Sequence, residues 1–425
     1  MKVASKSHLR NLAGKYAEYA LGDAMNARRE KWLLHNRLQE KTIPFHIEDN
    51  GTFHRDLCPP LECEDPEHRA LEARLLHTLI SYEKIDDDRV IPDRFVVDWA
   101  TTITDNCDEL VLTHANDRHG GSFGYKSNKP VKNIDRDFYK LKKREVTLDR
   151  NLTEKRAELA REVFAGLLPV AIGRPSSFYS NGITSKAVHL MGMQELYLQM
   201  AADPKAVHRL LTFLAEDNFA LGQWEEEQEL LTLNNDGNQG YCSGSSQYSD
   251  EIPGRKIGEG EAVRSRDRYG YLEAQEAAGI SPDMFGEFLM PHFLKAAKKF
   301  KLIKFGCCEP VHHLMPHLHK LNGLRKVSVT PWCDMEKLAA VCNPDIIWSR
   351  KPVPLKLCNS EFDPGEFRSH LRETLDVGKE YFIEFIFRDT NRLNGSMAER
   401  IGHACEIVRD VTGHPEGGKH LAKSA

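Results

Sequence analysis

Residues 324–354 read LRKVSVTPWCDMEKLAAVCNPDIIWSRKPVP, and they contain the clearest secondary-structure pattern of the chain. LRKVSVTPWC and DIIWSRKPVP are rich in β-branched and apolar residues and predict strands, whereas DMEKLAAVC between them predicts a helix. A strand, a helix and a second strand in this order form a βαβ unit, whose two strands lie parallel in one sheet. The stretch therefore predicts an α/β fold.

The same alternation continues on both sides of this unit. Helices are predicted at 281–300, 311–321, 361–378 and 396–411, and strands at 301–310 and 381–387. Ser281 followed by Pro282 is a typical helix start. Because strands and helices alternate through the second half of the chain, we expect a (β/α)8 TIM barrel.

The N-terminal part of the chain has a different pattern. Residues 65–85 have the composition of a helix, with Asp65 as its N-cap. Residues 41–64 contain Asn-Gly and Pro-Pro breakers and predict irregular structure. We expect a helical N-terminal extension at 1–90 and a TIM-barrel catalytic domain at 91–425.

The composition is that of a soluble globular protein. The chain has 425 residues, of which 28% are charged and 40% hydrophobic, and a formal net charge of -5. This balance does not favour nucleic acid as a partner. The sequence lacks an apolar run long enough for a transmembrane helix and an apolar N-terminal segment typical of a secretion signal. We therefore expect a cytoplasmic protein without membrane contact, whose ten cysteines are mostly free thiols.

Candidate functional residues follow from the barrel itself. Catalytic groups of TIM barrels come from the carboxyl ends of the strands and from the loops that follow them. The candidates at these places are Asn235 and the loop 236–253, Glu273, Gln275, Cys307, Cys308, Glu309, Trp332, Cys333, Arg350, Lys351 and Arg388. The set is rich in metal ligands and carboxylates, and it lacks the glycine-rich phosphate cradle of nucleotide enzymes.

Two adjacent cysteines end one of the predicted strands. Side chains alternate along a strand, so only one of Cys307 and Cys308 can face the barrel axis. That thiolate could bind zinc together with Glu273 of the preceding strand, since zinc accepts sulfur and carboxylate ligands. Two buried structural thiols explain the residues equally well, and a vicinal disulfide would be strained. His312 or His313 could serve as reserve ligands.

These residues resemble a known superfamily. GISPDMFGEFLMP, a strand that ends in GCCEP, and HLMPHLHKLNGLRKVSVTPWCDMEKLA resemble the uroporphyrinogen decarboxylase superfamily. The likeness covers most of the chain, is strongest over 271–345 and implies a (β/α)8 barrel. One branch of that superfamily decarboxylates uroporphyrinogen, and the other transfers methyl groups to or from a corrinoid protein with the help of zinc. The N-terminal segment ARREKWLLHNRLQEK lacks the substrate-binding pattern of the decarboxylases.

The resemblance is closer to the methyltransferase branch. Its members use a His-x-Cys motif at the strand end, a Glu on the preceding strand and a later Cys. Cys308 matches the Cys of the motif, Glu273 lies near the position of the Glu, and Gly306 replaces the His. The later Cys has no clear match, and Cys333 or Cys307 would substitute for it. GCCEP with EAQ upstream resembles the methyltransferase components of anaerobic O-demethylase systems.

The resemblance implies a function that can be stated residue by residue. A methyl group would move from a small methoxylated, aromatic substrate to a corrinoid that a partner protein supplies, and zinc or an acid would activate the leaving oxygen. The expected catalytic residues are Glu273, Glu309 and Arg350. The expected metal ligands are Glu273, Cys308, Cys307 and Cys333. The expected substrate-binding residues are Asn235, Tyr241, Tyr248, Gln275, Trp332 and Arg388.

Two other interpretations stay open on the sequence. A decarboxylase or lyase of a polycarboxylate would need cationic side chains in the site, for which Arg350, Lys351 and Arg388 are candidates. A non-catalytic protein that binds a corrinoid or a tetrapyrrole on a degenerate barrel would explain the missing motif residues. The sequence is also compatible with a homodimer.

Overall fold

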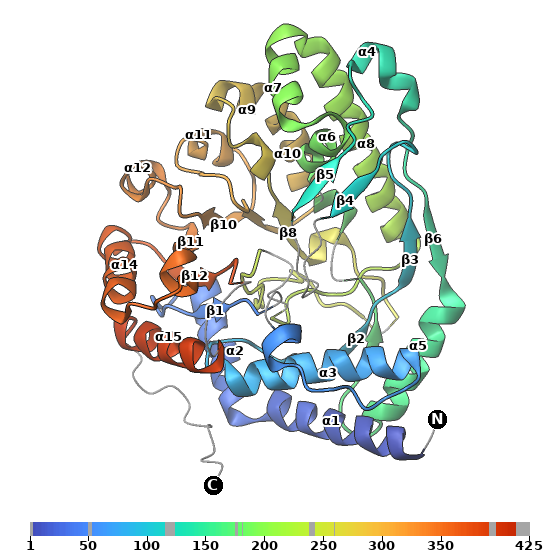
Figure 1. Ribbon diagram of the computed structural model, residues 1–425, viewed down its shortest axis with the longest axis vertical. Helices are drawn as coiled ribbons and strands as arrows, with labels where there is room; N and C mark the ends of the chain where they lie inside the picture. The colour runs from blue at the N-terminus through green and yellow to red at the C-terminus, as the bar shows by residue number, and fades with distance from the viewer. Residues whose placement is uncertain are drawn as a thin grey trace.

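The computed structural model describes residues 3–49, 53–114, 124–174, 177–180, 182–237, 243–258, 260–390 and 397–413. Within these residues, a six-stranded parallel sheet forms the centre of the molecule (Figure 1). Its strands, in spatial order, are β1 (Phe45–Ile47), β12 (Ile383–Phe387), β11 (Ile347–Arg350), β10 (Leu324–Val329), β9 (Leu302–Phe305) and β8 (Tyr269–Leu272). The βαβ units predicted from the sequence are therefore present.

Helices cover the outer side of this curved sheet, as Figure 1 shows. They are α9 (Pro282–Phe288), α10 (Met290–Ala297), α11 (Met315–Leu318), α12 (Met335–Val341), α13 (Leu355–Cys358), α14 (Pro364–Val377) and α15 (Met397–Val411). Strands β9, β11 and β12 are buried along their whole length, as expected for parallel strands that are covered on both faces.

The helix predicted at 281–300 begins as expected but is interrupted. The side chain of Ser281 accepts a hydrogen bond from the backbone N–H of Met284, 3.2 Å away, which confirms the cap. The chain then ends α9 and starts α10 at Met290. Pro291 lies in the first turn of α10, and a proline has no backbone N–H to continue the preceding helix.

A second parallel pair lies outside the six-stranded sheet. It consists of β2 (Phe95–Val97) and β7 (Val170–Ile172), and a single bridge joins Arg174 to Leu231. Leu231 joins the parallel pair through this single bridge and is not part of a longer strand. The fold is α/β with a curved parallel sheet of six strands, and the hydrogen bonds among the described residues do not close one eight-stranded sheet.

Strand β1 lies in a segment that the sequence predicted to be irregular. It pairs with β12 near the other end of the chain, with Phe45 opposite Phe385. The carboxylate of Asp87 accepts the backbone N–H of Ile47 at 2.9 Å and pairs with Arg89 at 2.8 Å. A strand of three residues has too little periodicity to be recognised, and tertiary contacts decide its structure.

In Figure 1, helices α1 (Val3–Leu21), α2 (Asp23–Asn36), α3 (Pro66–Lys84) and α5 (Arg150–Phe164) lie in the lower part of the molecule. Helices α4 (Ile134–Asp137), α6 (Ile183–Met191), α7 (Met193–Ala202) and α8 (Pro204–Glu227) lie in its upper part. Two antiparallel pairs join β3 (Ala100–Ile103) to β6 (Val146–Asp149) and β4 (Leu112–His114) to β5 (Tyr125–Ser127). Asp65 caps α3 as predicted, because its side chain accepts the N–H groups of Glu67 and His68.

The boundary after residue 90 stays a prediction. In the described part of the chain, every helix is too short or too polar to span a lipid bilayer.

Charged side chains are buried on one face of the sheet. The Lys326 ammonium group donates to the Glu384 carboxylate at 2.7 Å, and both side chains are almost fully buried. Lys326 also donates to Ser245 Oγ at 3.1 Å and to the Ser246 carbonyl at 3.0 Å. The segment of the loop with Ser245 and Ser246 is therefore anchored to the buried Lys326 of the sheet. Lys304 adds a second buried ammonium group, which donates to Ser349.

Candidate active site

Five polar side chains follow the ends of strands in the six-stranded sheet. They are Glu48 after β1, Glu273 after β8, Cys307 after β9, Lys351 after β11 and Arg388 after β12. Because the strands are parallel, their carboxyl ends meet at one edge of the sheet. The loop with Ser243 reaches the same edge and connects several of these side chains.

The turn that presents Cys307 depends on a glycine. Gly306 has φ of +102°, which a residue with a side chain rarely adopts. A β-carbon at this position would lie 3.0 Å from the β-carbon of Ser328 on β10. The place at which the methyltransferase pattern has a histidine therefore cannot hold one without strain.

Replacing Gly306 with alanine is expected to lower the free energy of unfolding by about 1–3 kcal/mol, because the backbone strain and the crowding at Ser328 act together. Urea denaturation of the full chain measures this loss. Gly14 in α1 is the matched control, since a β-carbon there meets nothing within 4 Å. An alanine at position 14 should leave stability unchanged or raise it by up to about 1 kcal/mol. Equal stability of the two variants would contradict the role of Gly306.

Hydrogen-bond donors surround the sulfur of Cys307. Ser243 Oγ lies 3.5 Å from it and Cys308 Sγ 3.7 Å, and the Tyr271 hydroxyl group also bonds to it. The bond with Cys308, followed by the charge of Lys351, holds the pKa of Cys307 well below its ordinary value, while the pKa of Cys308 is raised. Cys307 is half-buried among these groups, whereas Cys308 is exposed, and nearby cations favour the thiolate form of a cysteine.

Two cations reach Cys307 through Ser243. Lys351 Nζ donates to Ser243 Oγ at 2.6 Å and also to the carbonyl oxygen of Cys307. Arg388 donates to the same Ser243 oxygen and, at 2.9 Å, to Glu48. With both lone pairs of the Ser243 oxygen facing cations, its own proton is free to point at the Cys307 sulfur.

Carboxyl groups occupy the other side of the site. Burial, followed by the neighbouring charges of Glu309 and Glu276, raises the pKa of Glu273 to about 8. Glu309 is buried, and its carboxylate accepts the backbone N–H groups of Ala274 at 2.7 Å and Cys307 at 2.8 Å. Burial also raises the pKa of Glu309. The site therefore combines a carboxyl group whose pKa is raised with a sulfur whose pKa is lowered.

The four predicted zinc ligands do not come together as a set. Glu273 and Cys307 share the site, and Cys308 adjoins Cys307 but is exposed. Cys333 is buried elsewhere, and its sulfur lies 4.0 Å from the Asp334 carbonyl. Across the described ranges, no group of three or more His, Cys, Asp or Glu side chains is arranged to hold a metal ion. As placed in the described residues, the four side chains do not form a zinc centre, and bound zinc stays a prediction.

Arg350, predicted as catalytic, contacts protein groups instead. Its guanidinium group donates to the carbonyls of Thr330 at 2.7 Å and Val329 at 3.3 Å, and to Thr374. Burial lowers the pKa of Arg350 to about 10. Its place between β10 and α14 suits a residue that holds strand ends together.

The predicted substrate-binding residues are scattered along the edge. Asn235 donates to the carbonyls of Ser249 and Ile252, and the backbone oxygen of Tyr248 accepts from Asn36. Gln275 and Trp332 are exposed, Trp332 at 74%. Arg388 is the member of this set that belongs to the Cys307 cluster, by which we mean Cys307, Cys308, Ser243, Lys351 and Arg388. Tyr241 lies outside the described residues.

Two residues of the site were not predicted from the sequence. Tyr271 lies in β8 and Glu273 directly follows that strand, so the strand period could have placed both on one face. Glu48 was missed together with β1. Ser243 lies in the predicted loop 236–253, but the sequence did not single it out within that loop.

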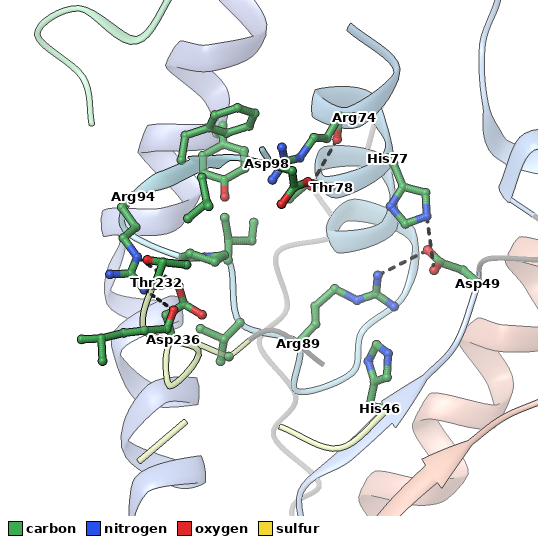
Figure 2. Close-up of a pocket in the computed structure, with 18 of the residues that line it drawn as sticks. His46, Asp49, Arg74, His77, Thr78, Arg89, Arg94, Asp98, Thr232 and Asp236 are labelled. Carbon is green, nitrogen blue, oxygen red and sulfur yellow. Dashed lines mark hydrogen bonds and ion pairs between the residues drawn. The ribbon is translucent and has the colours of Figure 1, made fainter. Parts of the chain in front are cut away.

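A cavity of about 370 Å³ lies beside β1 and β2. Figure 2 shows His77 and Arg89 pointing at Asp49 between them, and Arg94 paired with Asp236. Apolar side chains, among them Tyr16 and Phe95, complete the lining. Glu48 also lines this cavity and pairs with Arg388, so the cavity and the Cys307 cluster share a wall.

The comparisons with known proteins give little further guidance. No protein-family model and no curated protein matches the chain. Among solved structures, a methyltransferase from Methanosarcina mazei is similar, with a TM-score of 0.38 and 12% identity over 71% of this chain and 75% of that chain. A TM-score this low does not establish a shared fold, so function has to be inferred from the site itself.

Proposed function

We propose that this chain is a methyltransferase that moves a methyl group from a small methoxylated aromatic compound to a corrinoid carried by a partner protein. In this proposal Glu273 is the acid that protonates the leaving oxygen. The supporting observation is the position of Glu273, half-buried next to Glu309 and Glu276, where its pKa is about 8. A carboxyl group in such surroundings keeps its proton at neutral pH and can donate it.

The chemistry explains why an acid is needed. A methyl ether is a poor methyl donor because its leaving group is a strong base. An aromatic ether is the better donor, since phenol has a pKa near ~10 and water-like hydroxyls one near ~15.7. Protonation of the leaving oxygen lowers the barrier further, and acid catalysis of this kind contributes about 10²–10⁴-fold. The corrinoid would supply the nucleophile, while this chain binds and orients the donor.

The cavity is of a suitable size for such a donor. Small-molecule sites commonly measure about 300–1,000 Å³ and combine apolar walls with a few polar groups. The cavity beside Glu48 has both kinds of lining, and Phe95 and Tyr16 offer aromatic surfaces for a ring. We propose it as the entry to the site.

We also propose that the fold is an eight-stranded (β/α)8 barrel. Its strands would be the six of the parallel sheet together with β2 and β7. The segment with Leu231, which is bridged to Arg174, would then interrupt the contact between β7 and β8.

The decisive experiment mixes the protein with reduced cobalamin and a panel of methoxylated aromatics, and follows the absorption spectrum. The expected result is the spectrum of methyl-cobalt with at least one donor, and release of the corresponding phenol. A matched panel in which each methoxy group is replaced by hydroxyl is the control. Absence of methyl-cobalt with every donor would count against the proposal.

A second candidate is decarboxylation of a polycarboxylate. Lys351 and Arg388, two of the cations that this reaction needs, lie at the Cys307 cluster. The same donor panel, extended to aromatic polycarboxylates, separates the two functions, because only decarboxylation releases carbon dioxide without a corrinoid.

A further inference from the structure

The neighbours of Cys307 resemble those of a nucleophile and not those of a packing residue. Other cysteines of this chain, such as Cys405 and Cys63, are buried, and burial raises the pKa of each. Cys307 is half-buried at the open edge of the sheet, where hydroxyl groups and cations gather around it. Catalytic cysteines commonly occupy such electropositive, partly exposed places.

We propose that Cys307 is a metal-free nucleophile that takes the methyl group from the donor as a thioether, with Lys351 and Arg388 in the place that a metal ion would otherwise fill. This inference rests on the proposed methyl transfer and adds a covalent step to it. It also gives a role to Lys351 and Arg388, which are not among the predicted zinc ligands.

Hydrogen bonds connect two cations to the Cys307 sulfur. Lys351 and Arg388 both donate to Ser243 Oγ, so the Ser243 proton is directed at the Cys307 sulfur. Tyr271 supplies a second hydroxyl donor from the neighbouring strand. Two hydroxyl donors backed by two cations stabilise negative charge on sulfur in the way that coordination to zinc does.

The acid lies next to the strand that carries Cys307. Glu273 directly follows β8, and β8 pairs with β9, with Leu272 opposite Phe305, two residues before Cys307. Glu309 joins the two groups through its bonds to the N–H of Ala274 and the N–H of Cys307. A donor bound between them would present its methyl carbon to the sulfur and its oxygen to the acid, which is the arrangement that an in-line displacement requires.

The Cys307 sulfur forms a bond to the methyl carbon, the carbon–oxygen bond breaks with its electron pair on oxygen, and the proton of Glu273 moves to that oxygen. The products are S-methylcysteine at position 307, the free phenol and the Glu273 carboxylate. In the second half of the reaction a nucleophilic acceptor takes the methyl carbon, and the electron pair of the carbon–sulfur bond returns to sulfur. A thiolate of low basicity is a good leaving group in that half.

The first experiment treats the full chain with methyl 4-nitrobenzenesulfonate after incubation with a metal chelator. This probe needs no acid, because its leaving group is already a weak base. Mass spectrometry of the intact protein and its peptides should show one added methyl group, at Cys307. Cys358→Ser is the matched control, since Cys358 is another half-buried thiol, and this variant should be labelled as the wild type is. Preferential labelling at Cys308, equal labelling of several cysteines, or labelling that requires added zinc would overturn the proposal.

The second experiment removes the cation. Lys351→Met should slow methylation of Cys307 by about tenfold or more, and added zinc should not restore it. Lys356→Met is the control, because Lys356 pairs with Glu366 near the surface and does not contact Cys307. If Lys351→Met fails to fold, Ser243→Ala tests the same contacts from the other side. Unchanged labelling in the folded variant would contradict the role of the cations.

The covalent step and the overall function can fail separately. If Cys307→Ala forms methyl-cobalt at the wild-type rate, the covalent step is wrong and the methyltransferase proposal stands. If the wild type methylates Cys307 with the sulfonate ester and never forms methyl-cobalt with any ether, the nucleophile stands and the methyltransferase proposal is wrong.

Discussion

Replacing Glu273 with glutamine is expected to reduce the rate of methyl transfer from an aromatic ether by about 10²-fold or more. Glutamine keeps the shape and the hydrogen-bonding atoms of the side chain, but it cannot donate a proton to the leaving oxygen. The measurement is the rate of methyl-cobalt formation from a donor identified in the panel. Glu287→Gln, an exposed position in α9, is the matched control and should retain full activity.

The pH profile gives an independent test of the same role. The pKa of Glu273 is raised to about 8, so the group stays protonated through neutral pH and loses its proton as the pH rises through that value. The wild-type rate should therefore fall on the alkaline side of about 8. Glu273→Gln should lack this alkaline fall in its residual activity. A variant as active as the wild type, or a wild-type rate that increases through this range, would exclude Glu273 as the acid.

We expect the second large effect when Glu384 is replaced, and this effect is on the free energy of unfolding. This carboxylate is fully buried, and Lys326 donates to it at 2.7 Å. Glu384→Gln leaves the Lys326 ammonium group without its carboxylate, and breaking a buried pair in this way costs about 3–5 kcal/mol of the free energy of unfolding. Urea denaturation measures the loss. Glu373→Gln, on the exposed side of α14, is the control.

The direction of the pH dependence follows from the charges. Although burial opposes ionisation, Lys326 and the neighbouring His35 and Lys304 hold the pKa of Glu384 well below its ordinary value. A carboxyl group with a lowered pKa contributes stability above its ordinary pKa, and that contribution is lost as the pH falls through the folded value. The wild type should therefore lose more stability in acid than Glu384→Gln does. The double variant Lys326→Met, Glu384→Leu should recover part of the loss, because it removes both charges. A double variant less stable than Glu384→Gln would contradict this explanation.

Much of the second half of the fold could be predicted from residue patterns. The strands at β9, β10, β11 and β12 are short runs of apolar and β-branched residues, and buried parallel strands have this character. Asp65 and Ser281 start their helices as predicted, because a capping side chain bonds to backbone groups only a few residues away. Such local signals do not depend on the rest of the chain.

The candidate site was predictable only in part. Glu273 and the Cys307–Cys308 pair follow strands, and the rule for parallel strands directs attention to them. The rule does not say which of two adjacent cysteines becomes the thiolate. The pKa of Cys307 is lowered first by its bond with Cys308 and then by Lys351, Ser243 and Arg388, and these last three residues lie far apart in the sequence.

Residue patterns along the chain were enough to predict the alternation of strands and helices, the helix caps and the edge at which reactive side chains gather, since these depend on neighbouring residues and on the direction of the strands. Three features emerged only from the folded chain: the pairing of β1 with β12, the contacts of Ser243 with two cations and one sulfur, and the raised pKa of Glu273. Hydrogen bonds and charges act through space, and burial changes the pKa of a group according to what surrounds it, whatever its distance along the chain.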